Sequence, residues 1–222
     1  MLGLVRVLTT EDEKVLQEHS KVMKKKYGIA SISRCIPDQP NGIHSEETEK
    51  LAVPKIEKLV KDMIENDHVT AITISCAADP AVDLCRETTD VPVFGAGEVG
   101  AYAAVMVNRK IGVLGITPHV PPKIATILGD RLVAHAYPEG VRKTTDLMEE
   151  KAVGKAIEAA QSLINQGATC ILFACTGFST IGLKEELVKH VEVPIIDLVQ
   201  AQAIAYSLII LKGGDYFEPT YI

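Results

Sequence analysis

The stretches AITISCAADP (residues 71–80) and TCILFACTGFS (residues 169–179) follow one pattern, although they lie far apart in the chain. In each, an apolar run ends at a cysteine, Cys76 or Cys175, close to small residues and a turn. A short apolar run bounded by turn residues is typical of a buried strand. Each stretch therefore predicts a strand whose carboxyl end carries a thiol and leads into a helix.

The similarity between the two regions extends beyond the cysteines. VPVFGAGEVGAYAAVM (91–106) and VPIIDLVQAQAIAYSLI (193–209) both begin with Val-Pro and an apolar strand, and both continue into a helix of small residues. The cysteines are 99 positions apart, the prolines 102, and the opening strands VRVLTT and IGVLGIT about 106. Solenoid repeats have periods of roughly 20–50 residues, so this spacing predicts two related α/β units instead.

Strand-like and helix-like segments alternate along the chain. The expected strands are residues 4–8, 30–35, 71–75, 91–94, 111–116 and 171–174, and the expected helices include residues 11–27, 45–66, 80–88 and 98–107. Such alternation predicts an α/β fold of two pseudo-symmetric lobes, each a mostly parallel sheet flanked by helices. Ligands of these sheets bind at the carboxyl ends of the strands, so we expect the active site in the cleft between the lobes.

The predicted division of the chain follows from the repeat. We expect the first lobe to comprise residues 1–96 plus a returning segment, 200–222, and the second lobe to comprise residues 97–199. The chain would cross twice between the lobes, which predicts a hinge whose closure excludes water from the cleft.

Composition excludes several classes of partner. The 222 residues carry a net charge of -6, and Lys24, Lys25 and Lys26 form the one basic run that stands out, which argues against nucleic-acid binding. There is no apolar stretch of about 18 residues and no signal-peptide pattern at the start, so we expect no membrane span and a cytoplasmic location. The five cysteines have no zinc-ligand spacing and are expected to be reduced; we expect no bound metal.

Two thiols that face each other across a carbon acid suit one reaction. One thiolate removes the proton from the stereocentre, and the opposite thiol returns a proton to the other face. The ordinary thiol pKa, about 8.5, can be tuned near the working pH. A single cysteine at a strand end is more often a small buried hydrophobe, but matching positions in a repeated chain favour paired function for Cys76 and Cys175.

The developing negative charge on the substrate also needs hydrogen-bond donors. Hydroxyl groups and backbone N–H groups near the strand ends could supply them. The predicted substrate-binding residues are Thr9, Thr10, Ser75, Ala77, Ala78, Thr117, Thr176 and Gly177.

Several of these segments resemble a known superfamily, the aspartate/glutamate/hydantoin racemases. The segments that carry the resemblance are Ala174-Cys175-Thr176-Gly177, Ser75-Cys76 with Asp79-Pro80, and Val91-Pro92-Val93 with Gly97-Glu98. The last two look like the hydantoin racemase branch. The resemblance covers most of the chain, chiefly residues 71–211. It implies two α/β lobes, an active site between them, no cofactor, and a two-base mechanism with Cys76 and Cys175 as the bases.

Departures from the glutamate racemases bear on the substrate. Those enzymes carry a histidine two positions after the second cysteine and an acidic residue at the first strand end, whereas this chain has Gly177 and Thr9-Thr10 there. The prediction is therefore racemisation of a 5-substituted hydantoin or a related cyclic ureide. Two alternatives stay open: an aspartate/glutamate-type amino-acid racemase, and a non-catalytic small-molecule binding protein on the same fold. A homo-oligomer is also left open.

Two further residues have an open role. His119, in a proline-rich loop, either touches substrate or lies on the surface, and Glu98 either orders the hinge or begins a helix. Gly95, Gly97 and Gly100 give the outline of a dinucleotide fingerprint, but the acidic residue that should end the next strand is missing, so a nucleotide is not expected.

Overall fold

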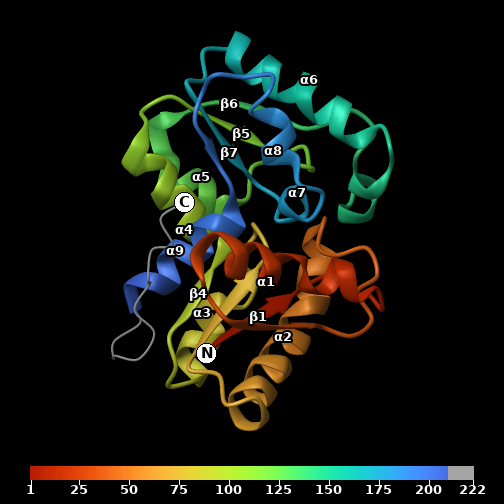
Figure 1. Cartoon of the computed structure of the whole chain (residues 1–222), viewed down its shortest axis with the longest axis vertical. Coiled ribbons are helices and arrows are strands. Elements are labelled where there is room, and N and C mark those ends of the chain that lie inside the picture. The colour runs from red at the N-terminus through yellow and green to blue at the C-terminus, as the bar shows by residue number, and fades with distance from the viewer. Residues whose placement is uncertain (210–222) are drawn as a thin grey trace.

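Two parallel sheets of the same strand order form the protein. The structure is a computed structural model that describes residues 1–209. The first sheet has the order β2-β1-β3-β4 and the second β6-β5-β7-β8, and every pairing in both is parallel. The two sheets occupy the lower and upper halves of Figure 1. The predicted fold of two related α/β lobes is confirmed.

The first sheet and its helices come from the first half of the chain. The strands are β1 (Leu2–Arg6), β2 (Ser31–Cys35), β3 (Ala71–Ser75) and β4 (Val93–Gly95). The helices are α1 (Glu13–Tyr27), α2 (Glu46–Asn66), α3 (Val82–Thr88) and α4 (Ala96–Val107).

The second sheet repeats this plan. Its strands are β5 (Ile111–Leu114), β6 (Leu132–Ala136), β7 (Cys170–Phe173) and β8 (Ile195–Ile196). The helices are α5 (Pro122–Leu128), α6 (Ala152–Asn165), α7 (Gly177–Thr180), α8 (Leu183–Leu187) and α9 (Leu198–Ile209), with short 3₁₀ turns η1 (Gly129–Arg131) and η2 (Thr144–Met148).

Strand register brings both cysteines to the carboxyl edges of their sheets. In the first sheet Arg6 pairs with Ser75, so β1 and β3 end together and Cys76 follows at once. In the second sheet Leu114 pairs with Phe173, and Cys175 follows two residues later. Because parallel strands all end at one edge, this register fixes where each thiol emerges.

The first strand differs from its expected position. It was expected over residues 4–8 but spans Leu2–Arg6, because Leu2 pairs with Ala71 and Arg6 with Ser75. The strand therefore ends earlier than predicted, and Val7 and Leu8 come directly after its carboxyl end.

Local sequence signals set the ends of the first two long helices. Asp12 accepts a hydrogen bond from Lys14 N (2.8 Å) at the start of α1, and Gly28 ends that helix with a φ of 67°. Ser45 and Thr48 form a reciprocal capping box at the start of α2. Such caps contribute about 1 kcal/mol each. The ends at residues 27 and 66 are as expected, whereas α1 begins two residues later than expected.

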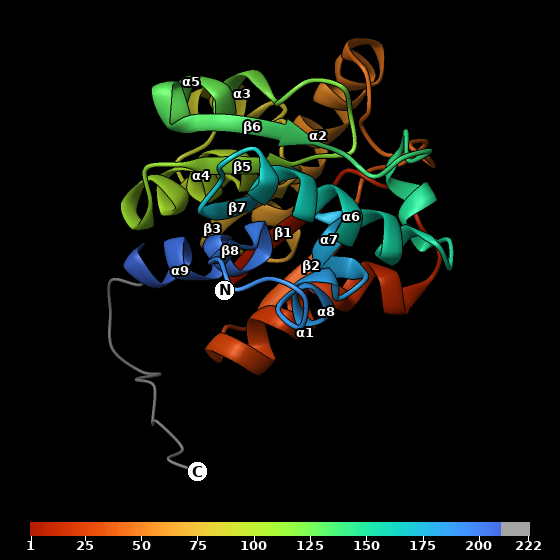
Figure 2. The same cartoon turned by 90° about the horizontal axis from the view of Figure 1, so that it is seen from above.

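One helix from each half of the chain packs against the sheet of the other half. Ala101 and Ala104 of α4 belong to the apolar core of the second sheet, while Val199 and Ala203 of α9 pack with Phe94 and its neighbours on the first sheet. Figures 1 and 2 both show α4 and α9 side by side where the halves meet. The division at residues 96/97 and 199/200 stays a prediction, and its residues 210–222 lie outside the described part.

No helix within residues 1–209 is long and apolar enough to span a membrane.

Asp79 fixes the start of α4. Its carboxylate accepts hydrogen bonds from Gly97 N (2.7 Å) and Glu98 N (2.6 Å). A Cβ at Gly97 would lie 2.2 Å from the carbonyl oxygen of Ala77, and one at Gly95 would lie 2.2 Å from Asp79 Oδ1. The outline of a dinucleotide fingerprint here therefore reflects close packing around Asp79.

We expect Gly97→Ala to lower the free energy of unfolding by roughly 1–3 kcal/mol, because the backbone at Ala77 must move to make room. The measurement is urea unfolding. Gly154→Ala is the control: no atom lies within 4 Å of a Cβ at that helical position, so about 0.5–1 kcal/mol of stabilisation is expected. Equal effects at the two glycines would contradict the packing argument.

Candidate functional site

One pocket of about 250 Å³ lies between the halves. The first half lines it with Arg6, Val7, Leu8, Ile43, His44, Ser45, Glu49, Ser75, Cys76, Ala77 and Ala78. The second half lines it with residues 116–122, Thr144, and Ala174, Cys175, Thr176 and Gly177. The size suits a small molecule, and the lining comes from the carboxyl ends of both sheets, where α/β ligands bind.

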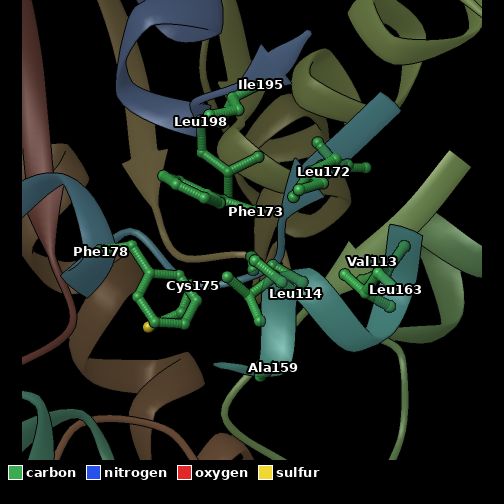
Figure 3. Close-up of a cluster of buried hydrophobic side chains, with 14 of the residues drawn as sticks. Val113, Leu114, Ala159, Leu163, Leu172, Phe173, Cys175, Phe178, Ile195 and Leu198 are labelled. Carbon is green, nitrogen blue, oxygen red and sulfur yellow. The ribbon is translucent and has the colours of Figure 1, made fainter. Parts of the chain in front are cut away.

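Both predicted cysteines line this pocket. Cys76 follows β3 and is 8% exposed, while Cys175 follows β7 and is 7% exposed. Both are free thiols. Cys175 belongs to the buried cluster drawn in Figure 3, which also holds Phe173 and Phe178. Each thiol thus has an apolar core behind it and the pocket in front.

The surroundings of Cys175 partly offset its burial. Burial raises the pKa of Cys175 to about 11. The backbone N–H groups of Gly177 and Phe178, the Thr144 hydroxyl and the Arg6 guanidinium all act in the opposite direction. Gly177 N lies 3.3 Å from the sulfur. These donors and this cation stabilise a thiolate at Cys175.

Cys76 has less support for its charged form. Burial again raises its pKa, and the Ala78 N–H is the one opposing group. The neighbouring Cys175, Asp79 and Glu49 raise the pKa further. The two thiols are therefore unequal, and Cys175 is the one that loses its proton more readily.

Six of the eight predicted substrate-binding residues line the pocket. They are Ser75, Ala77, Ala78, Thr117, Thr176 and Gly177. Their hydroxyl groups, however, bond within the protein: Thr176 Oγ1 donates to Ser75 O (3.0 Å), and Thr117 Oγ1 donates to His119 O (2.8 Å). Backbone N–H groups are consequently the better candidates for substrate contact.

Thr9 and Thr10 lie outside the residues that line the pocket. Because β1 ends at Arg6, Val7 and Leu8 take the place expected for the threonines. Thr9 Oγ1 donates to Ile36 O (2.6 Å) and accepts from Gln39 N (2.7 Å). Thr10 Oγ1 accepts from Asp12 N (3.1 Å) ahead of α1. Both hydroxyls hold loops together, and the structure does not bring either threonine into the pocket lining.

Five polar residues line the pocket without having been predicted as site residues: Arg6, His44, Ser45, Glu49 and Thr144. An arginine inside the apolar strand LGLVR is a visible signal in retrospect. Glu49 gave no such signal, because acids in the first turn of a helix are common for dipole reasons alone. Burial, with help from nearby Glu46, raises the pKa of Glu49.

His119 and Glu98 take different roles. His119 lines the pocket. Glu98 lies outside the pocket lining: it accepts from Gly95 N (3.1 Å) and pairs with Arg86 of α3 and with Lys123 of α5 (3.4 Å). Glu98 therefore both caps its helix and joins the first half to the second.

Among residues 1–209 there is no cluster of His, Cys, Asp or Glu side chains that could hold a metal ion.

Two sheets of one topology, each presenting a buried thiol to a shared pocket, define a two-lobed α/β protein with a paired-cysteine site. A family described as Asp/Glu/Hydantoin racemase matches residues 13–205. The chain belongs to this family, which places it among the racemase-type isomerases.

The individual relatives share less than 30% sequence identity with this chain. A hydantoin racemase from Pseudomonas sp. (strain NS671) is 29% identical over 172 residues, which cover 73% of this chain and 66% of that protein. One from Paenarthrobacter aurescens is 28% identical over 162 residues and 68% of either chain. The match thus spans about two thirds of each relative. The crystal structure of allantoin racemase from Pseudomonas fluorescens has a TM-score of 0.79 at 20% identity, covering 94% of this chain and 90% of that one.

The inequality of the thiols is testable by alkylation. Below its pKa, a thiol gains thiolate about tenfold per pH unit, and the thiolate is the reactive form. With the pKa of Cys175 raised to about 11 and that of Cys76 raised above it, we expect iodoacetamide to react slowly at pH 7 and increasingly fast up to pH ~10. Cys175 should react before Cys76.

Peptide mass spectrometry would follow each site separately. Cys85, which is 0% exposed inside α3, is the internal control and should stay unmodified while the fold persists. Equal rates at Cys76 and Cys175, or rates already constant by about pH 8, would contradict the assigned electrostatics.

Proposed function

We propose that this protein is a cofactor-independent racemase that uses Cys76 and Cys175 as paired bases on a small carbon acid. The observation that carries the proposal is the position of the two thiols: each follows the equivalent strand of its sheet, and both line one pocket. Membership of the racemase family supports the same reaction class.

The proposed reaction needs two proton transfers. A thiolate takes the proton from the stereocentre, so that the C–H bond breaks, an S–H bond forms and the electron pair stays on the substrate as an enolate. The opposite thiol then donates its proton to the other face of the carbon. Since Cys175 loses its proton more readily, the reactive form has the thiolate at Cys175 and the thiol at Cys76.

Two backbone N–H groups support stabilisation of the enolate. Within residues 1–209, the N–H groups of Ala77 and Thr176 donate to no protein acceptor, and both residues line the pocket. Donors fixed in a site that excludes water stabilise developing negative charge strongly, because they need no reorganisation during the reaction.

The charges of the pocket favour a neutral substrate. The Arg6 guanidinium is held by the carbonyls of Val15 (2.9 Å) and Leu16 (3.2 Å) and by Thr180. Glu49 has no ion-pair partner among the described residues and would repel a second carboxylate. The pocket would therefore bind the side-chain carboxylate of aspartate or glutamate weakly.

The tight packing around Gly177 also argues against an aspartate or glutamate substrate. A Cβ at this position would lie 2.8 Å from Leu147 Cδ1 and 3.2 Å from the sulfur of Cys175. A side chain here would require Leu147 to shift, and this chain lacks the histidine that glutamate racemases carry at this position. We propose a 5-substituted hydantoin or a related cyclic ureide as substrate, consistent with the hydantoin racemases and the allantoin racemase among its relatives.

A reducing compartment follows from the proposed chemistry. Both thiols must stay unoxidised to exchange protons, and all five cysteines are free in the structure. We therefore propose a cytoplasmic location.

Proton NMR in deuterium oxide tests the function directly. We expect the wild-type protein to remove the α-proton signal of a 5-substituted hydantoin or allantoin and to invert its configuration, with no exchange of aspartate or glutamate. Cys76→Ser and Cys175→Ser should each reduce racemisation by at least about 10³-fold, since each removes one of two obligatory proton carriers.

The two variants should also differ in stereochemistry. Each retains one thiol and should exchange the α-proton of one enantiomer only, without inverting it. Cys85→Ser, away from the pocket, is the matched control and should keep wild-type turnover. Ligand binding without deuterium uptake by the wild type would instead indicate a binding protein.

A further inference from the structure

A direct hydrogen bond joins the two cysteine-bearing segments. Thr176, the residue after Cys175, donates from Oγ1 to the carbonyl oxygen of Ser75, the residue before Cys76 (3.0 Å). Thr176 is 8% exposed and Ser75 is 1% exposed. The two segments that carry the thiols are thus in contact within a buried polar region.

His19 of α1 bridges the same two segments a second time. Its Nδ1 lies 2.9 Å from Ser75 Oγ, and its Nε2 lies 3.1 Å from Thr176 O and 2.9 Å from Thr180 Oγ1. The ring is completely buried. Burial and the nearby Arg6 cation lower the pKa of His19 well below its usual value, so the bridge is made by a neutral imidazole.

Arg6 anchors this bridge to the rest of the protein. Its guanidinium donates to the carbonyls of Val15 and Leu16 in α1 and to Thr180 Oγ1 (3.3 Å). The helix that carries His19 is therefore held from β1 in the first half and from α7 in the second. A ring held from both sides has little freedom to change the distance between the segments it connects.

We propose that His19 is a positioning residue that sets the separation of the Cys76 and Cys175 thiols. His19 does not line the pocket, so it acts through Ser75 and Thr176 and not on the substrate. The proposal rests on the paired-thiol reaction, in which both sulfurs must reach opposite faces of one carbon. A displacement of about 1 Å can cost 10²-fold in rate.

The test compares inversion with exchange. We expect His19→Leu, which removes the three hydrogen-bond contacts of the ring at similar volume, to lower kcat for racemisation about 10–100-fold with KM within about threefold of wild type. The nearer thiol can still remove and return a proton on one face. The ratio of inversion to α-proton exchange in deuterium oxide should therefore fall at least about fivefold.

Conservative variants distinguish positioning from folding. Glutamine places its amide near the position of Nε2, and asparagine places its amide near that of Nδ1. His19→Gln therefore keeps a hydrogen bond to the Thr176 segment, and His19→Asn keeps one to Ser75. Both should have inversion-to-exchange ratios between those of wild type and His19→Leu. These milder variants keep the proposal testable if His19→Leu does not fold.

Ser20→Ala is the matched control. Ser20 is the next residue of α1, is 9% exposed, and bonds to Ser33 (2.6 Å) away from the pocket. It should lose stability with an unchanged ratio, because a smaller folded fraction scales inversion and exchange equally. A ratio that is unchanged in His19→Leu would overturn the proposal.

A second measurement does not depend on turnover. Without the bridge the two segments keep the Thr176–Ser75 hydrogen bond but separate more easily. Iodoacetamide should therefore modify Cys76 and Cys175 several-fold faster in His19→Leu than in wild type or Ser20→Ala at the same pH. If the wild type exchanges no substrate, the racemase function fails, and this alkylation comparison alone decides on His19. Unchanged alkylation rates would reject its positioning role.

Discussion

The hydrogen bond from Thr176 Oγ1 to the Ser75 carbonyl joins the two halves at the point where each carries its cysteine. The position of one thiol relative to the other depends on contacts of this kind between the strand ends. The parallel register fixes each cysteine within its own sheet, but only contacts between the sheets can fix one cysteine relative to the other. The Thr176 hydroxyl bonds to the Ser75 carbonyl, and the Ser75 hydroxyl bonds to His19 and Gln202. Both hydroxyls are therefore engaged within the protein, although both residues line the pocket.

The packing of α4 and α9 across the halves stabilises the junction between the two strand ends. α4 packs into the core of the second sheet and α9 onto the first, so separating the halves would expose apolar surface from both. Glu98 adds ion pairs to Arg86 on one side and to Lys123 on the other. Motion between the halves is thereby confined to changes that keep α4 and α9 packed, and the polar region around His19 is the part that resists such motion near the thiols.

The sequence repeat was sufficient to predict the paired sheets and the positions of Cys76 and Cys175, because a repeat and a strand end can both be recognised from the order of residues alone. It was insufficient for the rest of the pocket. The expected contact of Thr9 depended on where β1 ends, which is set by pairing with β3 and shifts the strand toward the N-terminus. Glu49 and His19 belong to helices whose sequences show no sign of which residues face the junction. Contacts between segments more than 100 residues apart, such as His19 with Thr176, leave no local pattern to read.

Burial of the thiols has opposing consequences for the proposed chemistry. By raising their pKa values, it reduces the fraction of thiolate present near neutral pH. The thiolate that does form is a stronger base, and proton abstraction from a weakly acidic C–H bond becomes easier as the basicity of the acceptor rises. The surroundings of the two thiols differ. The donors around Cys175 make it easier to ionise, whereas the carboxylates near Cys76 make that thiol hold its proton more firmly. The proposed reaction needs one base and one acid at the start of each turnover. Two chemically identical side chains can fill these two roles because their surroundings give them unequal pKa values.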